Sequence, residues 1–148
     1  MPLRHYGEDA PRPLSDIVLE ELSMSWCRES GLLAPCAVPV PMGAVLGMDG
    51  EGRYVPYMAD ISAAAASIME EDQEDSGPQT QNTAKADKAV AVLISGDLSA
   101  SEETQPCTVI RRGARVAASN LYWLDGVEEE QKKTALSQLS ALGIVPKE

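Results

Sequence analysis

The residues best suited to chemistry in this chain are three cysteines, Cys27, Cys36 and Cys107, and a single histidine, His5. A thiol attacks as its thiolate, which usually forms beside a base such as histidine. His5 lies in a proline-rich stretch near the N-terminus, where no rigid frame is expected for a Cys–His pair. Because the cysteines are odd in number and lack C-x-x-C spacing, they predict reduced thiols in a cytosolic setting rather than a disulfide framework.

Carboxylates are the other candidates, and five of them fall in the run at residues 70–75. This run lacks the alternating ligands and the internal glycine of an EF-hand, so a solvated acidic loop is favoured over a calcium site. The glycine-rich stretch at residues 47–52 has no lysine and no following helix, which argues against a phosphate cradle. No Ser/His/Asp set and no dinucleotide fingerprint is found. We therefore predict that the protein is not an enzyme and uses no metal and no cofactor.

The length and the net charge of the chain restrict the partners that it can have. The chain has 148 residues, room for one modest core, and a formal net charge of −11. Proteins that neutralise nucleic-acid phosphates need clustered basic residues, and the longest cluster here is Arg111 and Arg112 with Arg115. No apolar run approaches the roughly 20 residues that cross a bilayer, and the N-terminus lacks the pattern of a signal peptide. We expect no direct nucleic-acid partner and no membrane partner.

The first third of the chain combines an irregular start with a β-like segment. Residues 1–14 contain three prolines and predict an extended leader. The apolar residues between 15 and 29 follow no clean period, which fits either a short helix or an arm that orders only against a partner. Residues 32–57 are β-like, and the turn at residues 49–52 predicts a hairpin because its glycines can take positive φ.

The rest of the chain alternates strands with one polar interruption. Residues 59–88 predict a solvated acidic insertion, and the apolar run at residues 89–94 predicts a strand buried on both faces. Residues 107–111 and 114–117 predict two strands paired with each other. A C-terminal helix is expected to follow a capping box at residues 125–128.

This helix should bury leucines on one side and end at Gly143. The fold class that results is α+β, mainly β: one small β-rich domain at residues 31–148, with a short C-terminal helix and an extended, flexible N-terminal arm at residues 1–30.

Five runs in this order and spacing resemble the head decoration proteins of lambda-like tailed phages: residues 43–47, 54–57, 89–93, 112–116 and 139–145. The step Trp26-Cys27-Arg28-Glu29 is similar to the aromatic-Ser-Arg-Glu step that precedes the first strand in that family. Two features depart from the family pattern. The acidic segment is longer than expected, and Leu124 stands where a proline often follows the tryptophan.

The resemblance implies a β-tulip-like domain that forms a homotrimer on the outer surface of an expanded phage capsid. Such a trimer stabilises the shell against the pressure of packaged DNA. The N-terminal arm would be the capsid-binding element, ordering on the major capsid protein in part by β-augmentation. The expected location is the virion, with the host cytoplasm as the site of assembly.

The resemblance also directs attention to two sets of residues. The residues expected to contact the capsid from the arm are Ile17, Val18, Leu19, Leu22, Trp26, Arg28 and Glu29. The residues expected at a trimer interface or in the core are Arg115, Tyr122 and Trp123. Internal packing remains the alternative for Ile17, Val18 and Leu19, burial beneath the helix for the two aromatic residues, and a solvated strand face for the arginine.

Two other functions remain open. The first is a calcium- or ligand-binding surface adhesion module that uses the acidic loop. The second is a hydrolase with a carboxylate site that carries no recognisable motif, and it is the weaker because no histidine or nucleophile supports it.

Overall fold

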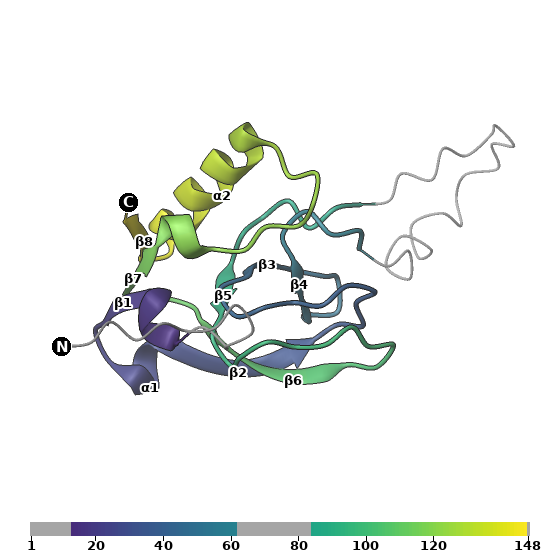
Figure 1. The fold of residues 1–148 in the computed structure, drawn as a ribbon, viewed down its shortest axis with the longest axis horizontal. Coiled ribbons are helices and arrows are strands. Elements are labelled where there is room, and N and C mark those ends of the chain that lie inside the picture. The colour runs from purple at the N-terminus through teal and green to yellow at the C-terminus, as the bar shows by residue number, and fades with distance from the viewer. Residues whose placement is uncertain (1–12, 62–83, 148) are drawn as a thin grey trace, which may run out of the picture.

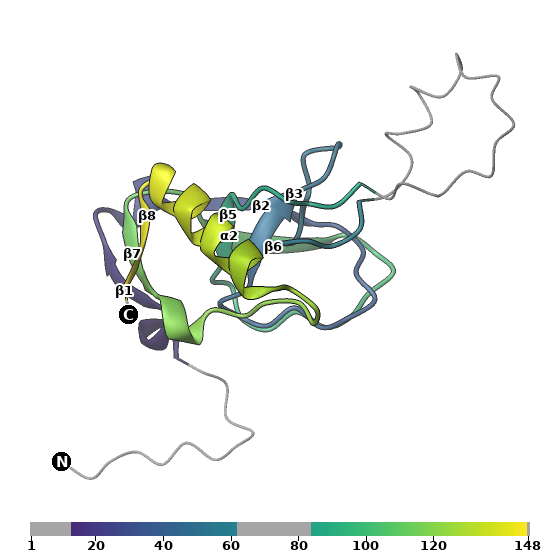
Figure 2. The same ribbon diagram turned by 90° about the horizontal axis from the view of Figure 1, so that it is seen from above.

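The chain folds into a closed β-barrel with a three-stranded sheet at one end and a helix packed over that sheet (Figure 1). The computed structural model describes residues 13–61 and 84–147. The predicted class, mainly β with a short C-terminal helix, is confirmed. Seen from above, the helix lies obliquely, with its start toward the barrel and its end beside the sheet (Figure 2).

The barrel and the sheet use different strands. The barrel has the order β2-β4-β3-β5-β6, with β2 Arg28–Leu33, β3 Val45–Met48, β4 Tyr54–Pro56, β5 Ala91–Leu93 and β6 Gln105–Ile110. The sheet has the order β1-β7-β8, with β1 Val18–Glu21, β7 Ala114–Ala117 and β8 Ile144–Lys147. The helices are α1 Met24–Cys27 and α2 Glu129–Ala141, and the 3-10 turns are η1 Leu14–Asp16 and η2 Ala118–Asn120. Because a closed barrel has no edge strands, the open edges of the named strands belong to β1 and β8.

One antiparallel ribbon passes from the sheet into the barrel. Its sheet half is β1 paired with β7, and its barrel half is β2 paired with β6. Between the pairs Glu20↔Arg115 and Arg28↔Ile110, one strand advances eight residues and the other only five. The three extra residues are accommodated in the segment that contains α1, which interrupts the ribbon in the manner of a large bulge.

The predicted pairing of residues 107–111 with residues 114–117 is wrong. β6 and β7 lie in different sheets, and each pairs with a strand from the N-terminal part of the chain instead. The physical reason is that β6 and β7 run on in the same sense along the ribbon, against β2 and then against β1, so the chain does not make the reversal between them that a hairpin needs. The N-terminal strands supply more pairing than a two-strand hairpin would.

The hairpin and the buried strand are found where they were predicted. β3 pairs antiparallel with β4, and the Asp49 carboxylate fixes the turn by accepting hydrogen bonds from the backbone N–H groups of Glu51 and Arg53, both at 2.9 Å. All three residues of β5 are buried.

The C-terminal helix is present, but its capping box lies one turn later than predicted. The N-cap is Glu128, whose N–H is 2.9 Å from Oε1 of Gln131. Gly126 has φ +89°, outside the helical region, which prevents the helix from starting at residue 125. The predicted end of the helix at Gly143 is confirmed, because this residue takes φ +86°. The strand β8, which follows and pairs in parallel with β7, was not predicted.

The core has two main parts. One cluster connects the sheet, η1 and α2, and includes Ile17, Val116, Leu139 and Ile144, all fully buried. A second cluster fills the barrel around residues such as Leu46. The first cluster makes the N-terminal segment from residue 14 onward a structural part of the domain.

Candidate functional site

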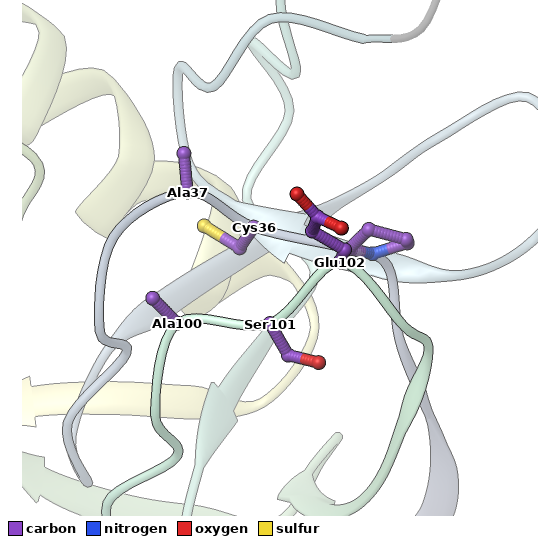
Figure 3. A pocket seen from close by; sticks show the side chains of 6 residues that line it. Cys36, Ala37, Ala100, Ser101 and Glu102 are labelled. Carbon is purple, nitrogen blue, oxygen red and sulfur yellow. The ribbon is translucent and has the colours of Figure 1, made fainter.

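The thiols form no catalytic arrangement among the described residues. Cys27 and Cys107 are buried, and burial raises the pKa of the Cys107 thiol, which disfavours the thiolate. Cys36 is partly exposed in a hollow of about 530 Å³, where Ser101 and Glu102 are its polar neighbours (Figure 3). No histidine lines this hollow to take the proton from the thiol, so the lining residues do not support nucleophilic catalysis.

The part of the chain that the structure describes also brings together no set of metal-binding side chains. Residues 13–61 and 84–147 contain no group of three or more His, Cys, Asp or Glu residues able to hold a metal ion. His5 and the acidic run at residues 70–75 lie outside the described residues. In the same described ranges, no helix is long and apolar enough to span a membrane.

The most distinctive surface is a set of exposed apolar side chains beside the bulge in the ribbon. Leu19, Leu22, Met24 and Trp26 expose 46%, 79%, 63% and 52% of their surface, and we call these four residues the apolar ridge. Large apolar side chains that are exposed at several positions of one short segment are a candidate interaction surface. Three of the four were predicted site residues, and Met24 was not.

The ridge is held in place by the loop that connects β6 to β7. The N–H of Leu22 donates to the carbonyl oxygen of Gly113 at 3.0 Å, and Nη1 of Arg112 donates to the carbonyl oxygen of Trp26 at 2.6 Å. The Arg112 guanidinium also lies 5.9 Å from the centre of the Trp26 ring. Each contact joins residues far apart in sequence, so the ridge is fixed by tertiary structure.

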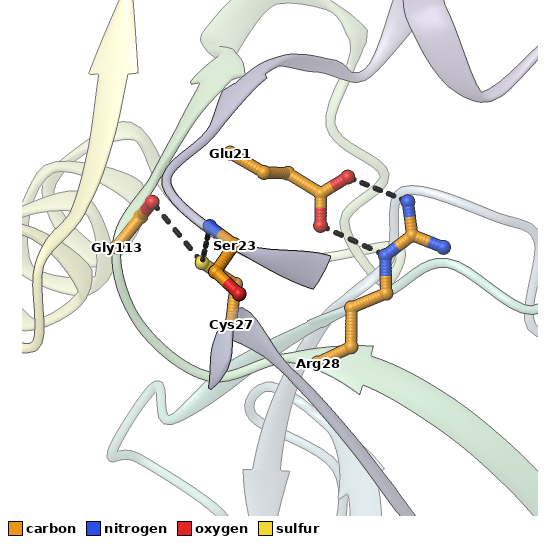
Figure 4. A network of polar contacts seen from close by, with 5 residues as sticks. All are labelled: Glu21, Ser23, Cys27, Arg28 and Gly113. Carbon is orange, nitrogen blue, oxygen red and sulfur yellow. Dashed lines mark hydrogen bonds and ion pairs between the residues drawn. The ribbon is translucent and has the colours of Figure 1, made fainter. Parts of the chain in front are cut away.

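Gly113 has a second role in this arrangement. A Cβ atom at this position would lie 2.4 Å from Cζ3 of Trp26, so a side chain here would force the Trp26 ring or the loop to shift. Its carbonyl oxygen accepts a hydrogen bond from Sγ of Cys27 at 3.3 Å, and this thiol in turn lies 3.4 Å from the N–H of Ser23 (Figure 4). The glycine therefore allows the loop and the bulge to meet.

An ion pair closes the bulge from the other side. The Arg28 guanidinium binds the Glu21 carboxylate through two hydrogen bonds, one of them 2.8 Å long from Nε to Oε2 (Figure 4). This hydrogen bonding lowers the pKa of Glu21 from its ordinary value of 4.5, against an opposing effect of burial. The pair joins the end of β1 to the start of β2 across α1.

The remaining arm residues do not share one environment. Ile17 is fully buried and Val18 nearly so, which makes internal packing the observed arrangement for both. Glu29 is partly exposed and pairs with Arg112 at 2.7 Å. Residues 14–30 therefore lie within the folded body, and the expected arm boundary at residue 30 falls inside β2. The sequence interpretation missed this because residues 15–29 are divided among a 3-10 turn, a strand and a helical turn.

The three residues expected at a trimer interface or in the core also separate. Trp123 packs against the main core cluster and meets Tyr57 edge to face, with ring centres 6.1 Å apart. Tyr122 packs partly buried against the barrel cluster. Arg115 is exposed on the outer face of the sheet, 3.3 Å from the Glu20 carboxylate of the neighbouring strand.

Comparison with known proteins identifies the family. The family described as Bacteriophage lambda head decoration protein D matches residues 8–144, nearly the whole chain. The chain belongs to this family. A search of curated proteins found no match.

Membership in the lambda head decoration family gives the chain a structural role in decorating the phage head. It confirms the resemblance drawn from the strand runs. It also implies a location on the virion capsid.

Proposed function

We propose that the protein binds the outer surface of the expanded phage capsid as a homotrimer and stabilises the shell against the pressure of packaged DNA. Its partner is the major capsid protein, and its N-terminal segment orders on that protein. The observation that carries this proposal is the family match over residues 8–144. Binding to the assembled lattice alone favours that lattice by mass action.

The open edge of β1 supports a role for the N-terminal segment. β1 pairs with β7 on one side, and among the described strands it has no partner on the other. An open edge can accept a strand from another chain. β8 is the other edge, but Pro146 lacks an N–H group, which makes that edge a poorer template.

The test is a reconstitution. Purified protein is added to expanded heads that lack decoration protein, and binding and the temperature of head rupture are measured. We expect saturable binding and a higher rupture temperature. The proposal is refuted if the protein binds neither expanded heads nor the major capsid protein. Sedimentation of the free and the bound protein tests whether it is a trimer.

The structure determines which truncation is informative. Deleting residues 1–30 would remove the buried Ile17 and half of β2, so loss of binding could result from unfolding. Deleting residues 1–12 removes nothing from the described core. If the N-terminal segment contributes to binding, this shorter deletion weakens attachment to expanded heads while the folded domain persists.

A further inference from the structure

We propose that Asp125 is a site of spontaneous covalent modification, at which the aspartate is converted into isoaspartate through a cyclic succinimide. The sequence contains two Asp-Gly steps, Asp49-Gly50 and Asp125-Gly126. The structure places these two steps in opposite environments, and the second one is free to react. This proposal goes beyond the capsid-binding function and does not depend on it.

The reaction needs no cofactor and no oxidant. The backbone nitrogen of the glycine attacks Cγ of the aspartate and loses its proton, a C–N bond forms, and one carboxyl oxygen leaves as water. A second water molecule then opens the ring. Attack at the side-chain carbonyl restores aspartate, whereas attack at the former main-chain carbonyl breaks its bond to nitrogen and leaves the chain running through the side chain. Glycine favours the first step because it has no Cβ to hinder its nitrogen.

The turn that precedes α2 leaves room for this reaction at Asp125. Asp125 and Gly126 are the exposed central residues of a turn that is closed by one hydrogen bond, from the Val127 N–H to the Leu124 carbonyl oxygen at 3.3 Å. A Cβ built on Gly126 would meet no atom within 4 Å, so a ring formed here collides with nothing. Within residues 13–61 and 84–147, no hydrogen bond engages the Asp125 carboxylate or the Gly126 N–H.

The turn between β3 and β4 opposes the same reaction at Asp49. One oxygen of its carboxylate accepts hydrogen bonds from the N–H groups of Glu51 and Arg53, and the other accepts one from Nε of Arg53, all at 2.9 Å. The Asp49 side chain is 4% exposed. The succinimide is neutral and keeps one carboxyl oxygen, so its formation breaks the ion pair with Arg53 and at least one of the three hydrogen bonds. The barrier to ring closure is therefore higher at Asp49 than at Asp125.

The position of Asp125 gives the modification a structural consequence. Isoaspartate adds its Cβ to the main chain, and the segments on both sides of it are fixed. On one side, the Trp123 ring packs edge to face against Tyr57, with ring centres 6.1 Å apart. On the other side, Glu128 is the N-cap of α2, and its N–H lies 2.9 Å from Oε1 of Gln131. The extra atom is therefore accommodated at the entry of α2, away from the barrel.

The experiment follows both Asp-Gly steps at once in the full chain. Folded protein is incubated at mildly acidic pH in water enriched in heavy oxygen, because each passage through the ring incorporates one oxygen atom from water. The protein is then digested with trypsin in ordinary water. The peptide of residues 29–53 has Asp49 as its single aspartate, and the peptide of residues 116–132 has Asp125. Fragmentation of the second peptide distinguishes label at Asp125 from label at Asn120.

Two controls accompany this measurement. Protein unfolded in urea gives the rate that each Asp-Gly step has without structure. The variant Asp125→Glu keeps the charge at an exposed position but would have to form a larger ring, so it should take up no label at residue 125.

We expect heavy oxygen to enter Asp125 of the folded protein about tenfold or more faster than Asp49, because the interactions lost at Asp49 add to its barrier. In urea the two rates should converge, and chromatography should resolve an isoaspartyl form of the peptide of residues 116–132. The proposal is overturned if folded protein labels Asp125 no faster than Asp49. It is also overturned if the same difference persists in urea, or if Asp125→Glu takes up label at residue 125.

Discussion

Replacing Ile17 by alanine tests whether the segment before β2 belongs to the folded body of the free protein. Ile17 is fully buried in the main core cluster, and its carbonyl oxygen accepts a hydrogen bond from the N–H of Ala117 at 2.8 Å. If this segment were a flexible arm, shortening the side chain would cost almost no stability. The structure predicts a large loss instead.

The magnitude follows from the atoms removed. The substitution deletes three buried carbons, worth roughly 0.8 kcal/mol each in transfer free energy, and leaves a cavity that adds to the cost. The total should be about 3 kcal/mol. With a urea m-value of roughly 1 to 3 kcal/mol/M, the unfolding midpoint should fall by about 1 to 3 M.

The assay is urea denaturation followed by tryptophan fluorescence at one fixed protein concentration, because assembly would make the midpoint depend on concentration. Leu19→Ala is the matched control, since Leu19 lies two residues away and is 46% exposed. It should change the free energy of unfolding by less than about 0.5 kcal/mol. Equal effects of the two variants would refute the packing described for residues 14–21.

Three further predictions concern the bulge and the thiols. Gly113→Ala should destabilise the protein by about 2 kcal/mol or more, because it combines a positive φ with a Cβ that would collide with Trp26; urea denaturation measures this. Glu21→Gln should cost less than about 1 kcal/mol at neutral pH, since the pair with Arg28 is partly exposed, and denaturation from pH 7 to pH 3 should show less acid destabilisation than in the unmodified protein. A thiol reagent added to native protein should modify Cys36 before the two buried cysteines, as peptide mass analysis would show.

These predictions have specific controls. Gly52→Ala also places a Cβ at a positive φ, +80°, but with no atom within 4 Å of it, so a cost equal to that of Gly113→Ala would contradict the collision. For Glu21, the lowered pKa means that its stabilisation is present above pH 4.5 and is lost as the pH falls through the lowered value. If the stability of Glu21→Gln changes with pH as that of the unmodified protein does, the stabilisation assigned to the ionised Glu21 carboxylate is wrong. Rapid reaction of all three thiols would contradict the burial of Cys27 and Cys107.

Local patterns in the sequence predicted those elements whose cause is local. The hairpin turn depends on Asp49 and its immediate neighbours, and the end of α2 depends on Gly143 alone, so both could be inferred from spacing. The pairing of β6 with β2 rather than with β7 depends on residues about 80 positions apart. No short-range pattern records that choice.

The residues of the candidate site also divide into those that local sequence could predict and those whose placement depends on distant residues. Leu22 and Trp26 were selected because apolar residues in a segment without clear period suggested a partner. Their placement, however, depends on Arg112 and Gly113, which are far away in the sequence. The sequence showed these two residues only as part of a basic cluster and of a strand-like run, with nothing to connect them to Trp26. Ile17 was grouped with them because composition does not distinguish an apolar residue that fills its own core from one that projects from it.

The position of the ridge determines how a force applied there would reach the rest of the protein. The two strands that continue into the barrel from this point, β2 and β6, pair along six residues each. The Arg111 N–H donates to the carbonyl oxygen of Cys27 at 2.8 Å, so the two crossings between sheet and barrel are themselves bonded together. A partner attached to the ridge would therefore load both strands at once, along hydrogen bonds that must break together.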